Sequence, residues 1–211
     1  MPAGIHAVAN IFEVSAGPVI KCIKHFIRAV NKLADRYIVW SSESRRTELA
    51  FFAWEKFGFR GCIGSVDGSQ VPLAYAPRVQ PWTFWDRDDR CIIHVLVFSD
   101  RNRSIIPVTF GFSSSASDEM VKEQVECVRF PGENVSLGEL FSGDKGMYST
   151  NRVVGPHIGQ SGPTASNKNL DWQLAPLRVI SKHNFGIVTG RRAGLKEIRV
   201  PLALRMTFWQ P

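Results

Sequence analysis

A nearly continuous apolar run, Cys91-Ile-Ile-His-Val-Leu-Val-Phe98, constrains the fold of this chain more than any other segment. Such a short run is typical of a central strand that is buried on both faces of a sheet. Residues 105–112 predict another strand. Upstream, residues 62–67 predict a strand that ends in a tight Asp-Gly turn, and residues 70–75 follow it. The middle of the chain is therefore expected to fold as a sheet.

A helix and a further strand are expected after this sheet segment. Ser117 is a predicted helix cap, and Asp118 in the first turn suits the positive end of the helix dipole. The buried stripe of this helix is expected to consist of Val121, Val125 and Val128. Residues 140–144 then predict a strand that ends in the carboxylate of Asp144.

The last predicted element is a long helix. Residues 155–169 are rich in Gly, Ser, Pro and Asn and predict a loop. Pro176 suits the first position of a helix, and Gly190 suits its C-terminal cap. The predicted order is strand, strand, strand, helix, strand, helix, which indicates an α/β domain with helices against a mixed sheet.

The N-terminal segment predicts two helices joined by a tight turn. Ser15 is a predicted N-cap, and Pro18 in the first turn costs no intrahelical hydrogen bond. The second helix carries one apolar stripe, formed by Val19, Ile23, Phe26, Val30 and Leu33. This outline fits either a helix-turn-helix, which would lack its usual upstream helix and so be truncated, or an αα-hairpin that only packs on the rest of the protein.

Charge and cysteine usage restrict the partners and the compartment. The chain of 211 residues has a formal net charge of +7 and a pI near 9.5, which favours polyanionic partners. Its four cysteines form no C-x-x-C pair, which fits reduced thiols in the cytosol or nucleus. No apolar stretch is long enough to span a bilayer, so no membrane partner is expected.

Three segments carry a family resemblance: Gly-Ser-Val-Asp67-Gly-Ser, Ser-Gly-Asp144-Lys-Gly-Met-Tyr and Arg178-Val-Ile-Ser-Lys182-His-Asn-Phe-Gly. Together they resemble the catalytic core of PIF/Harbinger-type DDE transposases, close to the versions found in fungi. The resemblance implies an RNase H-like fold for residues 58–211, after a helix-turn-helix-like segment at 1–36 and a helical connector at 37–57. It also implies a nuclear protein that acts on transposon-end DNA, commonly with a Myb-like partner protein, and a homo-oligomer is possible.

In that family two Asp and one Glu hold divalent ions for cutting and joining DNA. The Asp positions correspond to Asp67 and Asp144, which are the expected catalytic and metal-binding residues. Mg²⁺ or Mn²⁺ would suit these hard oxygen ligands, and a pair of such ions can activate the nucleophile and stabilise the leaving oxygen. The Glu position is Lys182, whose positive charge is expected to weaken metal binding and to impair catalysis.

Other acids and histidines offer weaker alternatives. Asp118 lies in a segment that resembles another part of the family pattern and is a possible replacement ligand, although a helix-terminal acid needs no catalytic role. Residues 86–89 are expected to form a solvated turn, and Glu197 lies beyond the last predicted helix. His94, inside an apolar strand, is expected to be a hydrogen-bonded core residue, and His183 has no recognisable partner.

Basic side chains in the C-terminal third are the expected DNA contacts, because such residues neutralise phosphates. They are Arg178, Lys182, Arg191, Arg192 and Lys196. The aromatic segment 81–85 either packs in the core or stacks on unpaired bases. Three functions remain open from sequence: a metal-dependent endonuclease and strand-transfer domain with impaired catalysis, an active nuclease that uses Asp118, and a non-catalytic DNA-binding or protein-interaction module.

Overall fold

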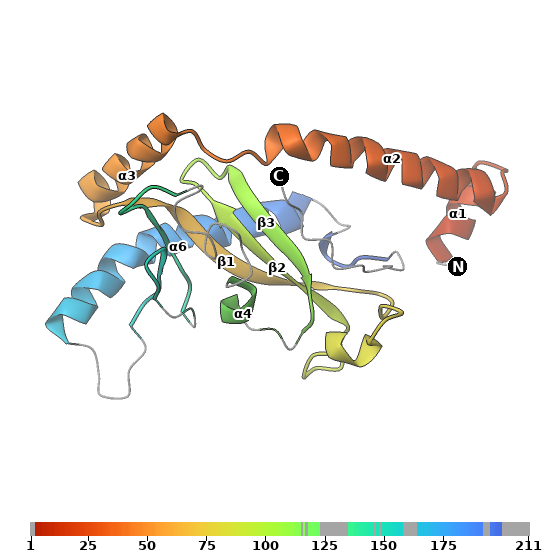
Figure 1. The fold of residues 1–211 in the computed structure, drawn as a ribbon. Coiled ribbons are helices and arrows are strands. Elements are labelled where there is room, and N and C mark those ends of the chain that lie inside the picture. The colour runs from red at the N-terminus through yellow and green to blue at the C-terminus, as the bar shows by residue number, and fades with distance from the viewer. Residues whose placement is uncertain are drawn as a thin grey trace. The chain divides into compact units, whose positions relative to one another are not determined.

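The computed structural model describes residues 3–114, 116, 118–122, 135–145, 147, 149–157, 164–191 and 195–199. The chain divides into two compact units, one ending at Val39 and the other beginning at Trp40. Within the second unit, helices flank a five-stranded mixed sheet, so this part of the protein is an α/β domain (Figure 1).

The first unit consists of two helices, α1 (Ala3–Ile11) and α2 (Ala16–Tyr37), which confirms the predicted pair. Ser15 occupies the N-cap position of α2 with an extended backbone, but its side chain makes no capping hydrogen bond. Buried Ala9 on α1 and buried Val19 on α2 mark the contact between the two helices. The two-helix outline leaves both the helix-turn-helix and the hairpin interpretation open.

The sheet of the second unit has the strand order β3-β2-β1-β4-β5. Its strands are β1 (Cys62–Pro72), β2 (Ile92–Ser99), β3 (Ile105–Phe112), β4 (Leu140–Ser142) and β5 (Val153–Val154). β2 pairs antiparallel with β1 and β3, whereas β4 runs parallel to β1 and β5 runs parallel to β4. β2 lies inside the sheet with nearly every side chain buried, as its apolar run predicts.

The predicted turn at Asp67-Gly68 is wrong. β1 continues through both residues, with Asp67 opposite Val97 and Gly68 opposite Leu96 on β2. The long apolar β2 supplies a partner for every residue from Ser65 to Pro72, and this ladder outcompetes the local turn. A sequence pattern that often marks a turn therefore lies here in the middle of a strand.

Helices cover both faces of this sheet. Helix α3 (Glu43–Phe57) ends at Gly58, whose positive φ of 70° forms a left-handed C-cap, and it confirms the predicted helix in this region. A short 3₁₀ helix, η1 (Pro81–Phe84), precedes β2. Helix α4 (Asp118–Lys122) places Val121 in the main core, whereas Ser117, Val125 and Val128 lie outside the described residues.

The longest element, α6 (Ala165–Arg191), begins eleven residues before the predicted start at Pro176, so the predicted loop at 155–169 is wrong from Ala165 onward. Pro176 lies inside the helix, where a proline removes one backbone hydrogen bond. Leu170, Leu174 and Leu177 pack into one cluster with Cys62 and compensate for this loss on both sides of the proline. The helix ends one residue after the predicted Gly190.

Two apolar clusters define the faces of the sheet. Leu96 and Phe98 of β2 and Val66 of β1 pack with Val121 of α4 in the main cluster. Cys62 of β1 packs instead with Leu174 and Leu177 of α6. α4 and α6 therefore lie on opposite faces, and Figure 1 shows α6 crossing its face of the sheet.

Candidate functional site

Asp67 lies on β1, and Asp144 lies two residues beyond the end of the adjacent strand β4. The parallel pairing of β1 and β4 sets Ser65 opposite Ser142, and each aspartate follows two residues later in its strand direction. Side chains alternate along a strand, and neighbouring strands lie about 5 Å apart. Because Val66 belongs to the cluster that contains α4, Asp67 points to the α6 face. Asp67 is buried there, with 8% of its surface exposed.

Asp144 faces α6 as well, because it contacts two cations of that helix. Arg178 Nη2 donates to Asp144 Oδ1, and Lys182 Nζ lies 3.5 Å from Asp144 Oδ2. The two basic residues are four positions apart, so they lie on one side of the helix. The sequence predicted both aspartates and both cations as site residues, and the structure brings Asp144, Arg178 and Lys182 into direct contact.

Burial and three nearby groups act on the pKa of the Asp144 carboxyl group. Burial raises its pKa, because a charged carboxylate loses hydration. The backbone N–H of Lys145, the guanidinium of Arg178 and the ammonium group of Lys182 all favour the carboxylate and together outweigh burial, so the pKa lies below its usual range. Asp144 is therefore charged at neutral pH and is held by cations.

The sheet-facing side of α6 also carries a polar side chain without a partner. Asn184 is buried, and both polar atoms of its amide lack a hydrogen-bond partner among the described residues. Buried polar groups are normally paired, so an orphaned amide of this kind calls for an explanation. Asn184 follows buried Leu177 by seven residues, about two helical turns, so both lie on one side of α6.

These residues do not fit a two-metal centre as they stand. Both oxygens of Asp144 contact side-chain cations, and the position at which the resemblance predicts a third carboxylate is Lys182, which carries an ammonium group. In the described part of the chain no three His, Cys, Asp or Glu side chains gather in a way that would hold a metal ion. The side chain of Asp118, the possible replacement ligand, lies outside the described residues.

The remaining predicted site residues are distributed around the domain. Arg191 at the end of α6 and Lys196 are exposed, and Arg192 lies outside the described residues. His94 is a buried core residue whose Nδ1 lies 2.8 Å from the carbonyl oxygen of Ala116, as predicted. Glu197 pairs with Arg199.

The aromatic segment at 81–85 borders an open hollow. Phe84 is buried as predicted for a core residue, but Trp82 and Trp85 are 72% and 49% exposed, so a core role is wrong for both tryptophans. Trp85, Arg87 and His94 line a hollow of about 920 Å³. The predicted solvated turn beside it is confirmed, because Asp86 Oδ1 accepts hydrogen bonds of 2.9 Å from the backbone N–H groups of Asp88 and Arg90.

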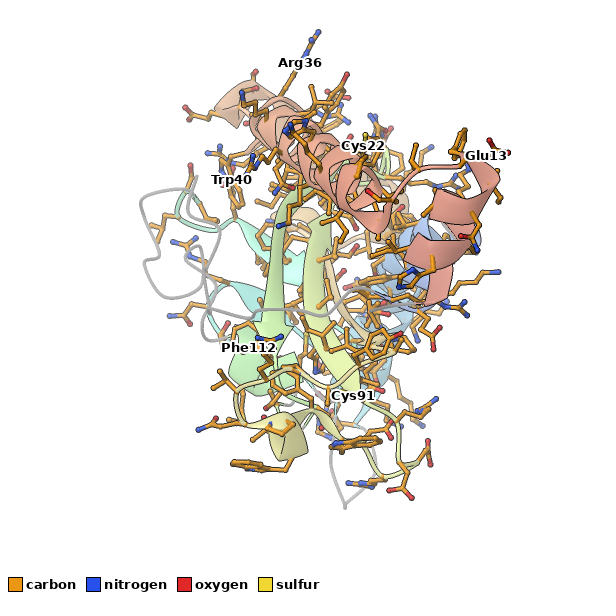
Figure 2. The ribbon with its side chains drawn as sticks, turned by 90° about the vertical axis from the view of Figure 1, so that its right-hand side faces the viewer. Glu13, Cys22, Arg36, Trp40, Cys91 and Phe112 are labelled. Atoms are coloured by element: carbon orange, nitrogen blue, oxygen red, sulfur yellow. The ribbon has the colours of Figure 1, made fainter. Side chains whose placement is uncertain are left out.

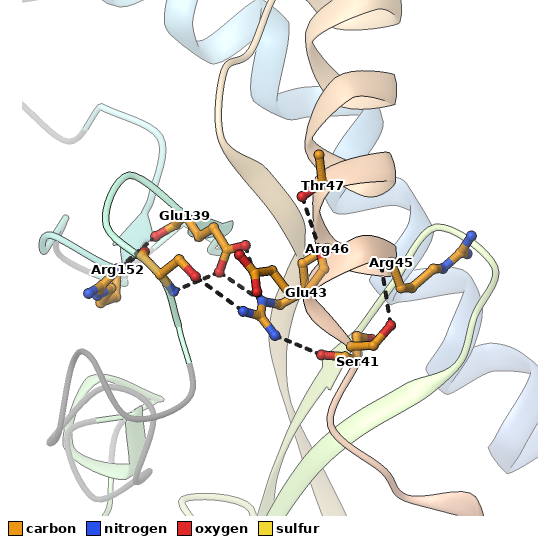
Figure 3. A network of polar contacts seen from close by, with 9 residues as sticks. Ser41, Glu43, Arg45, Arg46, Thr47, Glu139 and Arg152 are labelled. Atoms are coloured by element: carbon orange, nitrogen blue, oxygen red, sulfur yellow. Dashed lines mark hydrogen bonds and ion pairs between the residues drawn. The ribbon is translucent and has the colours of Figure 1, made fainter.

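A partly buried polar network was not predicted from the sequence. Arg46 Nε on α3 donates to both carboxylate oxygens of Glu139, at 2.8 and 3.1 Å, and Arg152 Nη1 donates to the carbonyl oxygen of Ser136 at 2.5 Å (Figure 3). Arg46 and Glu139 are 93 residues apart in the chain. No local pattern in the sequence could have indicated this pair.

No family model, curated protein or solved structure matches this chain. Among the described helices, none combines the length and apolar character needed to cross a membrane.

Proposed function

We propose that the second unit is an RNase H-like DNA-processing domain related to Harbinger-type DDE transposases, in which cleavage is impaired because Arg178 and Lys182 neutralise Asp144. One observation carries this proposal: Asp67 and Asp144 follow paired residues on parallel strands and point to the face covered by α6. The mixed sheet is compatible with an RNase H-like fold. The proposal keeps the expectations of a nuclear protein, transposon-end DNA and a Myb-like partner.

Electrostatics explains the impairment. At an effective dielectric constant of about 20, two unit charges 4 Å apart interact by roughly 4 kcal/mol. Lys182 is 55% exposed, so solvent screens a large part of this energy. Even a screened ammonium group repels a divalent ion, and Arg178 occupies the other oxygen of Asp144. Mg²⁺ or Mn²⁺ would have to displace both cations before these carboxylates could act as ligands.

The same excess of positive charge favours DNA binding. Asp144 supplies one negative charge against the two positive charges of Arg178 and Lys182. The remaining positive charge suits a phosphate group, and exposed Arg191 extends the basic side of α6. A non-catalytic DNA-binding module is therefore the second candidate function, and it differs from the first only in whether the site can be restored to cleavage.

Supercoiled plasmid incubated with Mn²⁺ tests the proposal. Lys182→Glu alone restores the missing carboxylate, but the new acid lies four residues from Arg178 and would pair with it. We therefore expect little nicking by the wild type, some by Lys182→Glu, and most by Arg178→Gln/Lys182→Glu. Adding Asp67→Ala to the double variant should abolish nicking, because it removes the second carboxylate.

Two results would contradict this proposal. Nicking by the wild type that Asp67→Ala abolishes would show that Lys182 is tolerated. If no folded variant nicks DNA while the wild type binds it in a salt-sensitive manner, the binding module becomes the better description.

The exposed tryptophans offer a separate nucleic-acid contact. Stacking of an unpaired base on an aromatic side chain contributes about 1–3 kcal/mol. We expect Trp85→Ala to weaken binding of single-stranded DNA about tenfold or more. Trp172→Ala is the matched control, because Trp172 on α6 is 71% exposed and does not line the hollow. Equal effects of the two substitutions would exclude a specific role for the hollow.

A further inference from the structure

Helix α2 carries an apolar seam with a heptad repeat. Along the helix, apolar residues recur in alternate steps of four and three residues. They are Val19, Ile23, Phe26, Val30, Leu33 and Tyr37. Alternate spacing of this kind keeps one face of a helix in register with a partner helix over several turns, as in a two-stranded coiled coil. The six residues occupy the d, a, d, a, d and a positions of successive heptads.

Most of this seam is exposed. Val19 is 8% exposed, but beyond the start of α2 the exposure is 37% for Ile23, 70% for Phe26, 46% for Val30, 48% for Leu33 and 69% for Tyr37. A phenylalanine or tyrosine side chain alone can bury about 150–250 Å², so the seam presents several hundred Å² of apolar surface. A contiguous apolar patch of this size often marks an interaction site.

The charges of α2 avoid the seam. Lys21, Lys24, Arg28 and Lys32 occupy the outer b, c and f positions of the repeat. The positions that flank the seam are Ile20, Cys22, Ile27, Ala29, Ala34 and Arg36, of which only Arg36 is charged. Figure 2 shows Cys22 and Arg36 extending from α2. Two copies of this helix can therefore meet without bringing rows of like charges together, and their lysines face outward.

We propose that α2 forms a two-stranded coiled coil with α2 of a second copy of this chain. In coiled coils, charged residues that flank the seam select the partner helix. The seam of α2 lacks such complementary charges, so nothing at its flanks favours a helix of another protein over a second copy of α2. Two such surfaces together approach the lower end of the range for stable interfaces, about 1,200–2,000 Å² in total. The helix of 22 residues, about 33 Å long, is sufficient for about three heptads.

This dimer is independent of DNA cleavage, since none of its residues belongs to the Asp144 cluster. It would join two copies of the second unit through their N-terminal helices. The outward lysines and Arg28 of both helices would then form a doubled basic surface.

Light scattering and sedimentation of the full chain test the proposal over a dilution series. We expect the wild type to have twice the chain mass of 23.6 kDa, and Phe26→Glu to raise the dimer dissociation constant at least about tenfold, because it buries a charge in the seam. Asn31→Glu is the matched control, since it adds the same charge at an outer position and should leave the dimer intact. Phe26→Ala provides a milder variant if Phe26→Glu affects folding, and circular dichroism checks the helix content of each.

Disulfide cross-linking tests which side of α2 faces the second copy. In a Cys22→Ser background, Val30→Cys places one thiol in the seam, and oxidation should yield a covalent dimer, whereas Asn31→Cys should not. A wild type that stays monomeric would overturn the proposal, and so would a dimer that Phe26→Glu does not weaken. Hydrogen exchange that shows a protected seam in a monomer would assign the seam to another part of this chain instead, and that result also overturns it.

Discussion

Two clusters of arginine and carboxylate in the second unit differ in how their carboxylate is paired. The Glu139 carboxylate receives one guanidinium, because Arg152 of the same network donates to main-chain carbonyl oxygens instead, and the side chains of Arg46 and Glu139 are only 11% and 12% exposed. Arg46 Nη1 also donates to the carbonyl oxygen of Ser41 at 2.8 Å, so the group is well satisfied. In the Asp144 cluster, one acid receives two cations, and Lys182 is half exposed.

The Glu139 cluster is a stabilising ion pair, whereas the Asp144 cluster is a site with surplus positive charge. A matched, nearly buried pair holds segments together, because removing either partner leaves the other charge desolvated and alone. An acid with two cations has positive charge to spare, and that charge is available to an anion from outside. The Glu139 cluster joins α3 to the segment before β4, whereas the Asp144 cluster lies where β4 ends against α6.

The largest effect is expected at the balanced cluster. Arg46→Ala leaves the Glu139 carboxylate with a backbone N–H of Ser136 but without its guanidinium. We expect the free energy of unfolding to fall by about 3 kcal/mol, which urea titration measures. Arg90→Ala is the control: the Arg90 side chain is 55% exposed and Asp86 keeps two backbone N–H donors, so the loss should stay within about 1 kcal/mol. Equal losses for the two variants would remove the distinction between the clusters.

At the unbalanced cluster, DNA affinity should change more than stability does. Arg178→Gln/Lys182→Gln removes both cations, and we expect binding to double-stranded DNA to weaken about tenfold. The slope of log K against log salt should fall by roughly one for each phosphate that the variant no longer neutralises. Binding measured at several salt concentrations gives both values. Lys56→Gln, at an exposed position near the end of α3, is the control for removal of charge alone.

If the double substitution leaves the salt slope unchanged, the surplus charge of the Asp144 cluster does not bind phosphate. DNA binding would then have to rely on other basic residues, such as Arg191 or Lys196.

The two clusters also show what sequence reasoning can reach. The apolar run in β2 and the acids at 67 and 144 were recognisable from local patterns, and the strand order brings both acids to one face. The contact of Arg178 with Asp144 depends on how α6 packs against the end of β4, which no local pattern indicates, and the predicted start of that helix at Pro176 is wrong. Packing of Leu170 and Leu174 extends the helix upstream, and this tertiary effect overrides the local signal of a proline.

The failures share a physical cause. At Asp67-Gly68 a turn was predicted from two residues, but pairing with β2 decides the backbone there. For the aromatic segment 81–85 the sequence left a core role and an exposed one open, and the short helix η1 buries Phe84 and leaves Trp82 and Trp85 exposed. In each case the outcome depends on pairing or packing with residues that are distant in the sequence, which a local pattern does not contain.

The smallest effect concerns the pH dependence of stability at Asp144. Burial raises the pKa of this carboxyl group, whereas the Lys145 N–H and Arg178 lower it. The net effect is that the folded-state pKa lies below the unfolded one. The stabilisation is therefore present above the unfolded pKa of about 3.9 and is lost as the pH falls through the folded pKa. Unfolding free energies of the wild type and Asp144→Asn should differ at pH 6, and the difference should shrink as the pH falls below about 3.9.

Arg178→Gln sharpens this test, because it removes one of the two strongest contacts that favour the charged carboxylate while the opposing influence of burial remains. In that background, Asp144→Asn should change stability at pH 6 less than it does in the wild type, and urea titration of the four proteins closes a double-mutant cycle. An unchanged difference would mean that Arg178 does not hold the charge of Asp144. The surplus positive charge would then come from Lys182 alone. Only this exposed lysine would then distinguish the Asp144 cluster from the Glu139 cluster.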